Sequence, residues 1–215
     1  MSSMYDKIMD LPLFKGIGEE MLSQMLEKTS VEFLKFTDND LIHKNGEEVG
    51  GLDFVLNGHL SISHKIKDFE INVEEKVGEG EVIGACNLFG LYNNYTADII
   101  AEGLVNIMRI YKNDYISILM SDKIYMLNYV NYICASTQKK TNLLQSFNPE
   151  SITSVLTTLA NSLTGGGKRT LILEGSDFEI ARYCGISINE LKEWEAKELS
   201  NERILLTEKG LLLKN

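Results

Sequence analysis

The sequence predicts an α+β protein with three parts: a small N-terminal β-sandwich or barrel, a long helix and a C-terminal winged helix-turn-helix. Three observations predict this order. Residues 31–111 alternate short apolar runs with turns that contain glycine, which is typical of a small sandwich or barrel. Residues 114–144 contain neither Gly nor Pro, as one long helix requires. Two helix-start signals then lie eleven residues apart, at Ser176 and Ser187.

The composition predicts a globular cytoplasmic chain with no membrane partner. Its 215 residues are 44% hydrophobic, which is enough for one large core or two small ones. No window of about 18 residues is continuously apolar, so we expect no transmembrane helix. Asp6, Lys7 and Asp10 interrupt the N-terminal region, so we expect no signal peptide.

The formal net charge of −10 is unusual for a protein that binds nucleic acid. Residues 1–145 carry 21 acidic and 13 basic residues, a net charge of −8, and residues 146–215 carry 10 and 8, a net charge of −2. Phosphate contacts normally supply much of the affinity of a DNA-binding domain. DNA binding by the C-terminal part would therefore rely on local basic clusters, or be weak or sensitive to salt.

The N-terminal part is predicted to begin with helical structure and to continue as strands. Residues 5–28 look helical, with a break at Pro12. The expected strands are Val31–Phe36, Leu52–Leu56, Leu60–His64, Glu70–Val73, Glu81–Ile83, Ala97–Ala101 and Val105–Ile110.

The long helix carries a short heptad pattern. Two series of residues are spaced seven apart, namely Leu127, Cys134 and Thr141, and Val130, Thr137 and Leu144. Two or three heptads do not diagnose a coiled coil. The alternatives are a helix that pairs two copies of the chain and a helix that packs on its own domain.

A new helix is predicted after Asn148-Pro149, with Asn148 as N-cap and Pro149 as the first helical residue. An apolar stripe at helical spacing follows, formed by Ile152, Val155, Leu156, Leu159, Ala160 and Leu163. Gly165–Gly167 then predicts a turn and Arg169–Leu173 a strand. The domain boundary is placed near residues 146–149.

The stretch 176–194 predicts two short helices that meet at a tight turn. Ser176 with Glu179 and Ser187 with Glu190 have capping-box spacing. Gly185 suits the left-handed conformation of the turn, and the small Ala181 lets the helices cross closely. The residues expected to face the core of this unit are Ile180, Cys184, Ile186, Leu191 and Trp194. Arg203–Leu206 and Leu211–Leu213 predict a hairpin, the wing of a winged helix-turn-helix, which commonly places its second helix in the major groove of DNA.

Four segments, taken in order, resemble motifs of the cyclic-AMP receptor protein / fumarate-nitrate regulator family (CRP/FNR). They are Leu11–Phe14 with Gly16-Ile17, Asn45–Glu47, Phe54–Leu60 and Val77–Gly84. The resemblance covers nearly the whole chain. It implies a jelly-roll-like β-sandwich in residues 1–112, which is a cyclic-nucleotide-binding-domain-like β-roll sensor. It also implies a long dimerisation helix in 113–147 and a winged helix-turn-helix DNA-binding domain in 148–215.

The cyclic-nucleotide-binding members of this family carry a Glu that binds the ribose and an Arg that pairs with the phosphate. Here Gly84 is followed by Ala85, Cys86 and Asn87, and the position of the Arg is occupied by Tyr95. A cyclic phosphate buried without a cation would be an unpaired charge, so we expect no ordinary binding of cyclic AMP. The residues expected to line the remaining pocket are Gly84, Ala85, Cys86, Asn87, Tyr95, Thr96, Ser136 and Thr137. An uncharged or weakly polar effector and the absence of any effector are both open.

The second helix of the pair would read DNA. The family commonly has two arginines here, and this chain has Ile188 and Glu193 in their place. Asn189 can still pair with adenine, Lys192 can reach guanine and Ile188 can contact a thymine methyl group. The full set of expected DNA contacts is Ser176, Arg182, Ser187, Ile188, Asn189, Lys192, Lys168, Arg169 and Lys209. The excess of Glu in residues 187–199 also fits a helix-turn-helix that has lost strong DNA binding.

No cofactor is expected. Residues 1–30 contain no cysteine, so the iron–sulfur cluster of some family members is not supported, and Cys86, Cys134 and Cys184 form no CxxC pair. They are interpreted as free buried thiols, and His43, His59 and His64 as solvated or hydrogen-bonded side chains and not as haem ligands. No nucleophile elbow, P-loop or zinc-protease motif occurs, so the chain is not expected to be an enzyme. The expected partners are a double-stranded DNA operator, a second copy of the chain, a small-molecule effector and RNA polymerase. The alternative is a DNA-inactive module of the same fold for protein interaction or ligand sensing.

Overall fold

The computed structural model of the chain describes residues 4–163, 170–208 and 210–213. These residues form two compact units. The first contains residues 4–61 and 77–137, and the second contains residues 62–76, 138–163 and the described residues from 170 onward. The second unit therefore includes the end of a hairpin whose base lies in the first, and no pattern in the sequence indicated this sharing.

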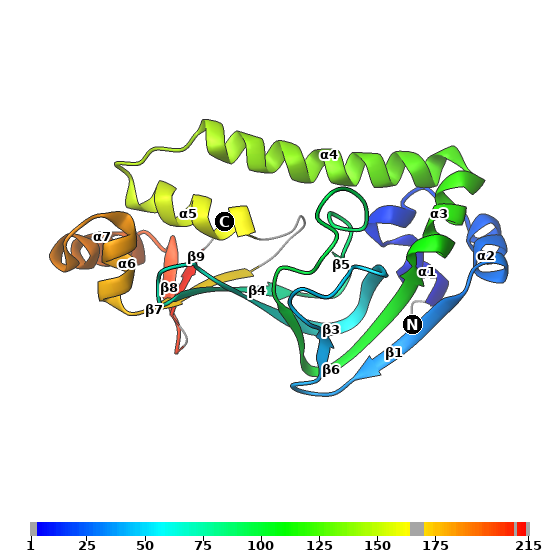
Figure 1. Cartoon of the computed structure of the whole chain (residues 1–215), viewed down its shortest axis with the longest axis horizontal. Helices are drawn as coiled ribbons and strands as arrows, with labels where there is room; N and C mark the ends of the chain where they lie inside the picture. The colour runs from blue at the N-terminus through cyan, green and yellow to red at the C-terminus, as the bar shows by residue number, and fades with distance from the viewer. Residues whose placement is uncertain (1–3, 164–169, 209, 214–215) are drawn as a thin grey trace. The chain divides into compact units, whose positions relative to one another are not determined.

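The first unit is an antiparallel β structure preceded and followed by helices (Figure 1). Its elements are α1 (Met4–Met9), a 3-10 turn η1 (Pro12–Phe14), α2 (Glu19–Lys28), β1 (Val31–Phe36), β2 (Leu41–His43), β3 (Gly51–Lys65), β5 (Val82–Ile83), β6 (Asp98–Tyr111), α3 (Lys112–Ser121) and α4 (Lys123–Gln145), of which β3 and α4 continue into the second unit. The strand order is β1-β6-β3, with β2 also on β6 and β5 on β3. The register of β1 on β6 runs from Val31 opposite Ile110 to Phe36 opposite Val105.

The core of the first unit joins the strands to the N-terminal helices. Phe14 of η1 packs on Phe54 of β3, with ring centroids 5.2 Å apart, and meets the edge of Tyr125 of α4 at 6.1 Å. All three side chains are almost fully buried. Burial of such large aromatic surfaces is a major source of stability and fixes the N-terminal helices against the sheet.

The second unit contains three helices and four strands among its described residues and has its own core. It comprises β4 (Ile71–Val77), α5 (Ile152–Leu163), β7 (Thr170–Gly175), α6 (Asp177–Cys184), α7 (Ile188–Ser200), β8 (Ile204–Leu206) and β9 (Leu211–Leu213). Strand β4 pairs antiparallel with β7, and the order continues through β9 to β8. Leu156 and Leu159 of α5 join Leu173 of β7 in this core, so the stripe predicted on this helix is confirmed.

Several predicted strands are shorter than the strands that form. The two apolar runs 52–56 and 60–64 are parts of one strand, β3, and the runs 97–101 and 105–110 are parts of β6. Each pair was separated in the prediction because glycine interrupts it, at Gly58 and Gly103. Both glycines have positive φ within a continuous strand, so these residues are irregularities and not turns.

The long helix is divided, contrary to the prediction of one continuous helix over residues 114–144. Helix α3 ends at Ser121, Asp122 is extended (φ −152°, ψ 145°), and α4 begins at Lys123. The Asp122 carboxylate accepts a hydrogen bond from the Ile124 N–H at 2.8 Å. Asp122 is thus the N-cap of a new helix. The helix break was not predicted because it contains neither Gly nor Pro.

The predicted start of α5 is also wrong. The helix begins at Ile152 and not at Pro149. The Asn148 side chain accepts from the Glu150 N–H at 3.0 Å in a turn before the helix, and Ser151 accepts from the Ser154 N–H at 3.3 Å. Ser151 therefore takes the capping position that was assigned to Asn148.

The predicted glycine turn at 165–167 and the start of the strand at Arg169 lie outside the described residues. None of the helices in the described part of the chain is long and apolar enough to cross a membrane.

Candidate functional site

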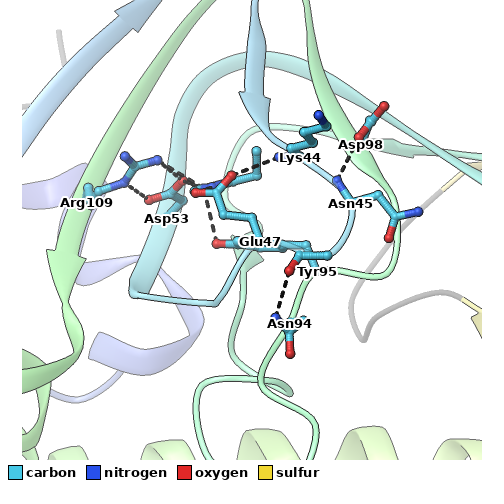
Figure 2. A network of polar contacts seen from close by, with 10 residues as sticks. Lys44, Asn45, Glu47, Asp53, Asn94, Tyr95, Asp98 and Arg109 are labelled. Carbon is cyan, nitrogen blue, oxygen red and sulfur yellow. Dashed lines mark hydrogen bonds and ion pairs between the residues drawn. The ribbon is translucent and has the colours of Figure 1, made fainter.

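A buried polar network lies among β2, β3 and β6 in the first unit. The Arg109 guanidinium donates to both carboxylate oxygens of Asp53, from Nε to Oδ1 and from Nη2 to Oδ2, each at 2.6 Å (Figure 2). Nε2 of His43 lies 2.7 Å from Asp53 Oδ2. Asp53 is 1% exposed and His43 is 7% exposed. An ion pair at this depth is sustained because both carboxylate oxygens of Asp53 have charged or polar partners.

The charge balance of the network is reflected in the pKa of its members. Burial alone would raise the pKa of Asp53, but the hydrogen bonds from Arg109 and His43 outweigh it, and the pKa lies below its ordinary value. Asp53 in turn raises the pKa of Arg109. Both groups are therefore ionised over the whole physiological range.

Tyr95 joins this network from the loop that precedes β6. Its hydroxyl lies 3.1 Å from His43 Nε2, and the two rings stack with centroids 4.1 Å apart. Tyr95 is 7% exposed, and burial followed by the charge of Asp53 raises its pKa. The residue in the position expected for a phosphate-binding arginine therefore faces a histidine and an already paired carboxylate. Arg109 is already bonded to Asp53 through Nε and Nη2, and its Nη2 also lies 3.0 Å from His43 Nε2.

The other predicted effector-pocket residues are brought together in part. The Cys86 thiol lies 3.6 Å from the Ser136 hydroxyl, and the Tyr129 hydroxyl donates to the carbonyl of Ala85 at 2.9 Å. These contacts link the segment after Gly84 to α4. Cys86 and Cys134 are exposed, so the prediction of buried thiols is wrong for both. Asn87 instead donates to the carbonyl of Tyr92 at 3.2 Å within its own loop. Thr96 and Thr137 are exposed, and Thr137 donates to the Ile133 carbonyl of its own helix.

The second candidate site is the helix pair α6 and α7 in the second unit. Ser176 accepts from the Glu179 N–H, and Ser187 forms a complete capping box with Glu190. Gly185 ends α6 in the left-handed conformation at φ 68°, as predicted. The predicted core residues are confirmed, with Ile180 and Leu191 buried and Cys184, Ile186 and Trp194 packed against them. Hairpin β8–β9 follows α7 directly.

The predicted capping box at Ser176 is only half formed. Glu179 does not return a bond to the cap, because its carboxylate accepts from the Glu70 N–H at 3.1 Å and pairs with Arg182 at 2.9 Å. Glu70 lies in the turn before β4, a contact that local sequence spacing does not show.

Two of the cations expected at DNA, Lys192 and Arg182, are engaged elsewhere in this unit. Lys192 pairs with Asp177 at 2.6 Å and with Glu195 at 3.0 Å. The Arg182 guanidinium donates to the Asp68 carbonyl at 2.7 Å and lies 4.5 Å from the centre of the Phe69 ring. Each must exchange a partner before it can contact a phosphate or a base.

The remaining residues of this site are distributed as follows. Ile188 is 44% exposed and Asn189 is exposed at the start of α7. Glu195 and Glu198 are buried, at 5% and 4% exposure, so their carboxylates do not lie on the exposed side of α7. Lys168, Arg169 and Lys209 lie outside the described residues.

Sequence reasoning missed the Asp53 network. Asp53 and Arg109 are each a single charged residue between apolar neighbours, in Leu-Asp-Phe and Met-Arg-Ile. Two opposite charges in such apolar segments indicate a buried ion pair, and this pattern could have revealed the network. Their pairing depends on the register of β3 and β6, which are far apart in the sequence.

The comparisons with known proteins agree with this fold. The model of the family described as Cyclic nucleotide-binding domain matches residues 33–122. The Thermus thermophilus catabolite activator protein has a similar structure, with a TM-score of 0.53, 16% sequence identity, and coverage of 94% of this chain and 93% of that chain. No curated protein sequence matches the chain significantly.

Two solved structures of single domains, one a sensor domain and one an N-terminal domain, are similar to a smaller part of this chain. The sensor domain of the transcriptional regulator DNR from Pseudomonas aeruginosa has a TM-score of 0.50 and 15% identity, over 61% of this chain and 91% of that one. The N-terminal domain of a transcriptional regulator from Streptomyces coelicolor A3(2) has a TM-score of 0.50 and 21% identity, over 64% and 93%. The chain thus has a cyclic nucleotide-binding-domain fold, and its neighbours include transcriptional regulators.

Proposed function

We propose that this chain is a DNA-binding transcription regulator of the CRP/FNR type, without enzymatic activity, that acts in the cytoplasm as a homodimer. The functional division would be a sensor in residues 1–112, a dimerisation helix in 113–147 and a DNA-binding domain in 148–215. One observation carries the proposal. In a chain whose residues 33–122 match a cyclic nucleotide-binding domain, two capped helices joined at a left-handed glycine are followed by a hairpin.

Helix α4 supports the homodimer. Leu127, Val130 and Leu144 are 55%, 44% and 66% exposed, and they belong to the two heptad series of this helix. Apolar side chains that recur at this spacing and remain exposed in one copy suit a two-fold helix pair. Two copies would present two α7 helices to two DNA half-sites, the usual arrangement for a helix-turn-helix dimer.

Helix α7 would supply base readout at its N-terminal end. Asn189 is exposed there and has the donor and acceptor pair that adenine requires. Ser176 and Ser187 stand at helix starts, where backbone N–H groups can hold phosphates. Lys192 can reach guanine only by leaving Asp177 and Glu195, which makes its contribution smaller than that of a free cation. The operator is accordingly proposed to favour A·T pairs, with modest affinity and strong salt dependence.

Replacing Asn189 or Lys192 with Ala should each lower the free energy of specific DNA binding by about 1–3 kcal/mol. Asn189→Ala should relax the sequence preference. The loss of binding free energy for Lys192→Ala should lie at the lower end of this range, because Lys192 has to give up its ion pairs with Asp177 and Glu195 to contact a base. Gel-shift titration on an operator chosen from random duplexes measures both. Lys197→Ala, on the same helix beyond the expected contact region, is the matched control. Unchanged affinity in both variants would contradict the proposed docking.

The sensor is proposed to take an effector other than cyclic AMP, or none. A cyclic phosphate would meet Tyr95 where a cation is needed, and Arg109 is already neutralised by two hydrogen bonds to Asp53. Arg109 would have to abandon a buried carboxylate to bind phosphate, leaving an unpaired charge behind.

Titration calorimetry with cyclic AMP and with cyclic GMP should therefore show no binding in the micromolar range. The control is the same titration of a Tyr95→Arg variant, which shows whether a cation alone restores the site. Micromolar binding of either nucleotide by the unaltered chain would refute this part of the proposal.

A further inference from the structure

The tip of the β3–β4 hairpin, residues 66–70, contacts helix α6 within the second unit, across 109 to 114 positions of the sequence. Strand β4 pairs with β7 from Ile71 opposite Gly175 to Lys76 opposite Thr170 (Figure 1). The Ile66 N–H donates to the Ile71 carbonyl at 2.9 Å and closes the hairpin. The sheet of the second unit therefore includes a strand from the N-terminal half of the chain, and the hairpin tip extends from it to α6.

Arg182 of α6 is the centre of this contact. Its guanidinium donates to the Asp68 carbonyl at 2.7 Å and pairs with the Glu179 carboxylate at 2.9 Å. The central carbon of the guanidinium lies 4.5 Å from the centre of the Phe69 ring, which is a cation–π distance. The Phe69 ring also meets Tyr183 in a T-shaped arrangement, with centroids 5.1 Å apart. Both the backbone and a side chain of the hairpin tip thus hold Arg182 in place.

Glu179 makes the release of Arg182 unfavourable. Glu179 is 8% exposed, and its carboxylate also accepts from the Glu70 N–H at 3.1 Å. If Arg182 moved away to contact a DNA phosphate, this buried carboxylate would lose its cation. An ion pair broken in this way destabilises the folded chain strongly, because one charge stays buried without its partner.

The position of Arg182 on α6 also turns it away from α7. Successive residues of an α-helix are rotated by about 100°, so Arg182 lies about 140° around α6 from Asp177. Asp177 is the residue that pairs with Lys192 of α7, the helix proposed to read bases. Arg182 therefore lies on a different side of α6 from the one that joins the proposed reading helix.

We propose that Phe69 and Arg182 form a latch between the hairpin tip and α6, and that Phe69 is a positioning residue for DNA binding. The latch fixes α6, and α6 holds α7 through the pair between Asp177 and Lys192. Arg182 contributes to DNA binding through the latch, in contrast to the direct DNA contact expected from the sequence. This inference rests on the proposed function, because it names the residues that hold the reading helix.

The first measurement needs no DNA. Urea unfolding of the full chain is followed by the fluorescence of Trp194, the single tryptophan, which lies in α7 and donates to Thr153 of α5. Phe69→Leu keeps an apolar side chain without the ring, and Arg182→Gln removes the charge. Each should lower the urea midpoint, and the double variant should lower it by clearly less than the sum of the two. Phe147→Leu changes a ring that is 44% exposed and should leave the midpoint unchanged. Additive shifts would overturn the latch.

The second measurement separates a latch from a phosphate contact. Binding of an operator selected from random duplexes is titrated by fluorescence anisotropy between about 50 and 200 mM salt. Phe69→Leu and Arg182→Gln should each weaken binding about threefold to tenfold, the range of one cation–π contact, with the salt slope unchanged. Loss of a direct phosphate contact would instead reduce the slope by about 0.9. Phe69→Tyr keeps the ring and should bind like the unaltered chain, as should Phe147→Leu.

The outcomes distinguish this inference from the proposed function. The inference fails while the proposed function stands if Phe69→Leu binds the operator normally, if Phe69→Tyr is as weak as Phe69→Leu, or if Arg182→Gln reduces the salt slope. A chain that binds no duplex would overturn the proposed function together with the positioning role. The unfolding measurement would then still decide whether the latch exists.

Discussion

Asp53→Ala is expected to lower the free energy of unfolding by about 3–5 kcal/mol, the largest effect of any polar substitution considered in this chain. The reason is the charge that it leaves behind. Arg109 keeps a side chain that is 18% exposed and loses both of its carboxylate bonds. His43 loses its contact at 2.7 Å in the same substitution.

The pH dependence of this effect has a definite sign. Asp53 has a lower pKa in the folded chain than its unfolded value of about 3.9, so its contribution is fully present above about pH 4 and is lost as the pH falls through the folded pKa. Urea unfolding of the two proteins, followed by circular dichroism, should show the full difference at pH 7. The difference should shrink below about pH 4.

A matched control is Glu79→Gln, which removes one partner of the exposed pair Lys7–Glu79 at 3.0 Å. Its effect should be under about 1 kcal/mol, because solvent screens the pair. If Asp53→Ala were no more harmful than Glu79→Gln, the network would not stabilise the sheet. Arg109→Met in the Asp53→Ala background should recover part of the loss, since it removes the unpaired cation.

Gly58→Ala is expected to cause the second large loss in the free energy of unfolding. Gly58 has φ 92° in β3, and an added Cβ would meet the carbonyl oxygen of Leu104 in the neighbouring strand. The conformational strain costs about 1–2 kcal/mol, and moving one strand away from the other costs about 1–3 kcal/mol more.

Gly80→Ala separates these two costs. Gly80 has a similar φ of 86°, but nothing lies within 4 Å of its added Cβ. Thermal unfolding of the two variants should therefore show a loss of about 1–2 kcal/mol for Gly80→Ala and a clearly larger one for Gly58→Ala. Equal losses would mean that β3 can move from β6 without cost.

Local patterns in the sequence predicted those features that depend on neighbouring residues. Strand β1 has the predicted bounds, the second capping box is complete, and Gly185 has the left-handed conformation. Each of these depends on residues within about four positions, so the chain itself shows the relevant chemistry. The β-rich structure of residues 31–111 was also predicted, from short apolar runs separated by glycine.

Long-range pairings were not predictable in the same way. Asp53 meets Arg109 across 56 positions, and Glu70 donates its N–H to Glu179 across 109. Lys192 illustrates the consequence for function: its sequence position suggests a free cation, and its neighbours Asp177 and Glu195 neutralise it.

The proposed regulator function is tested most directly by selecting duplexes that bind the full chain from a random pool at low salt, with sequencing of those retained. We expect a two-fold-related pair of half-sites, rich in A·T pairs, with centres one helical turn of about 34 Å apart or a multiple of it. We also expect the Asn189→Ala variant to lose this enrichment. A pool that remains random, or a single unrepeated half-site bound by one copy, would contradict the account and favour a DNA-inactive module of the same fold.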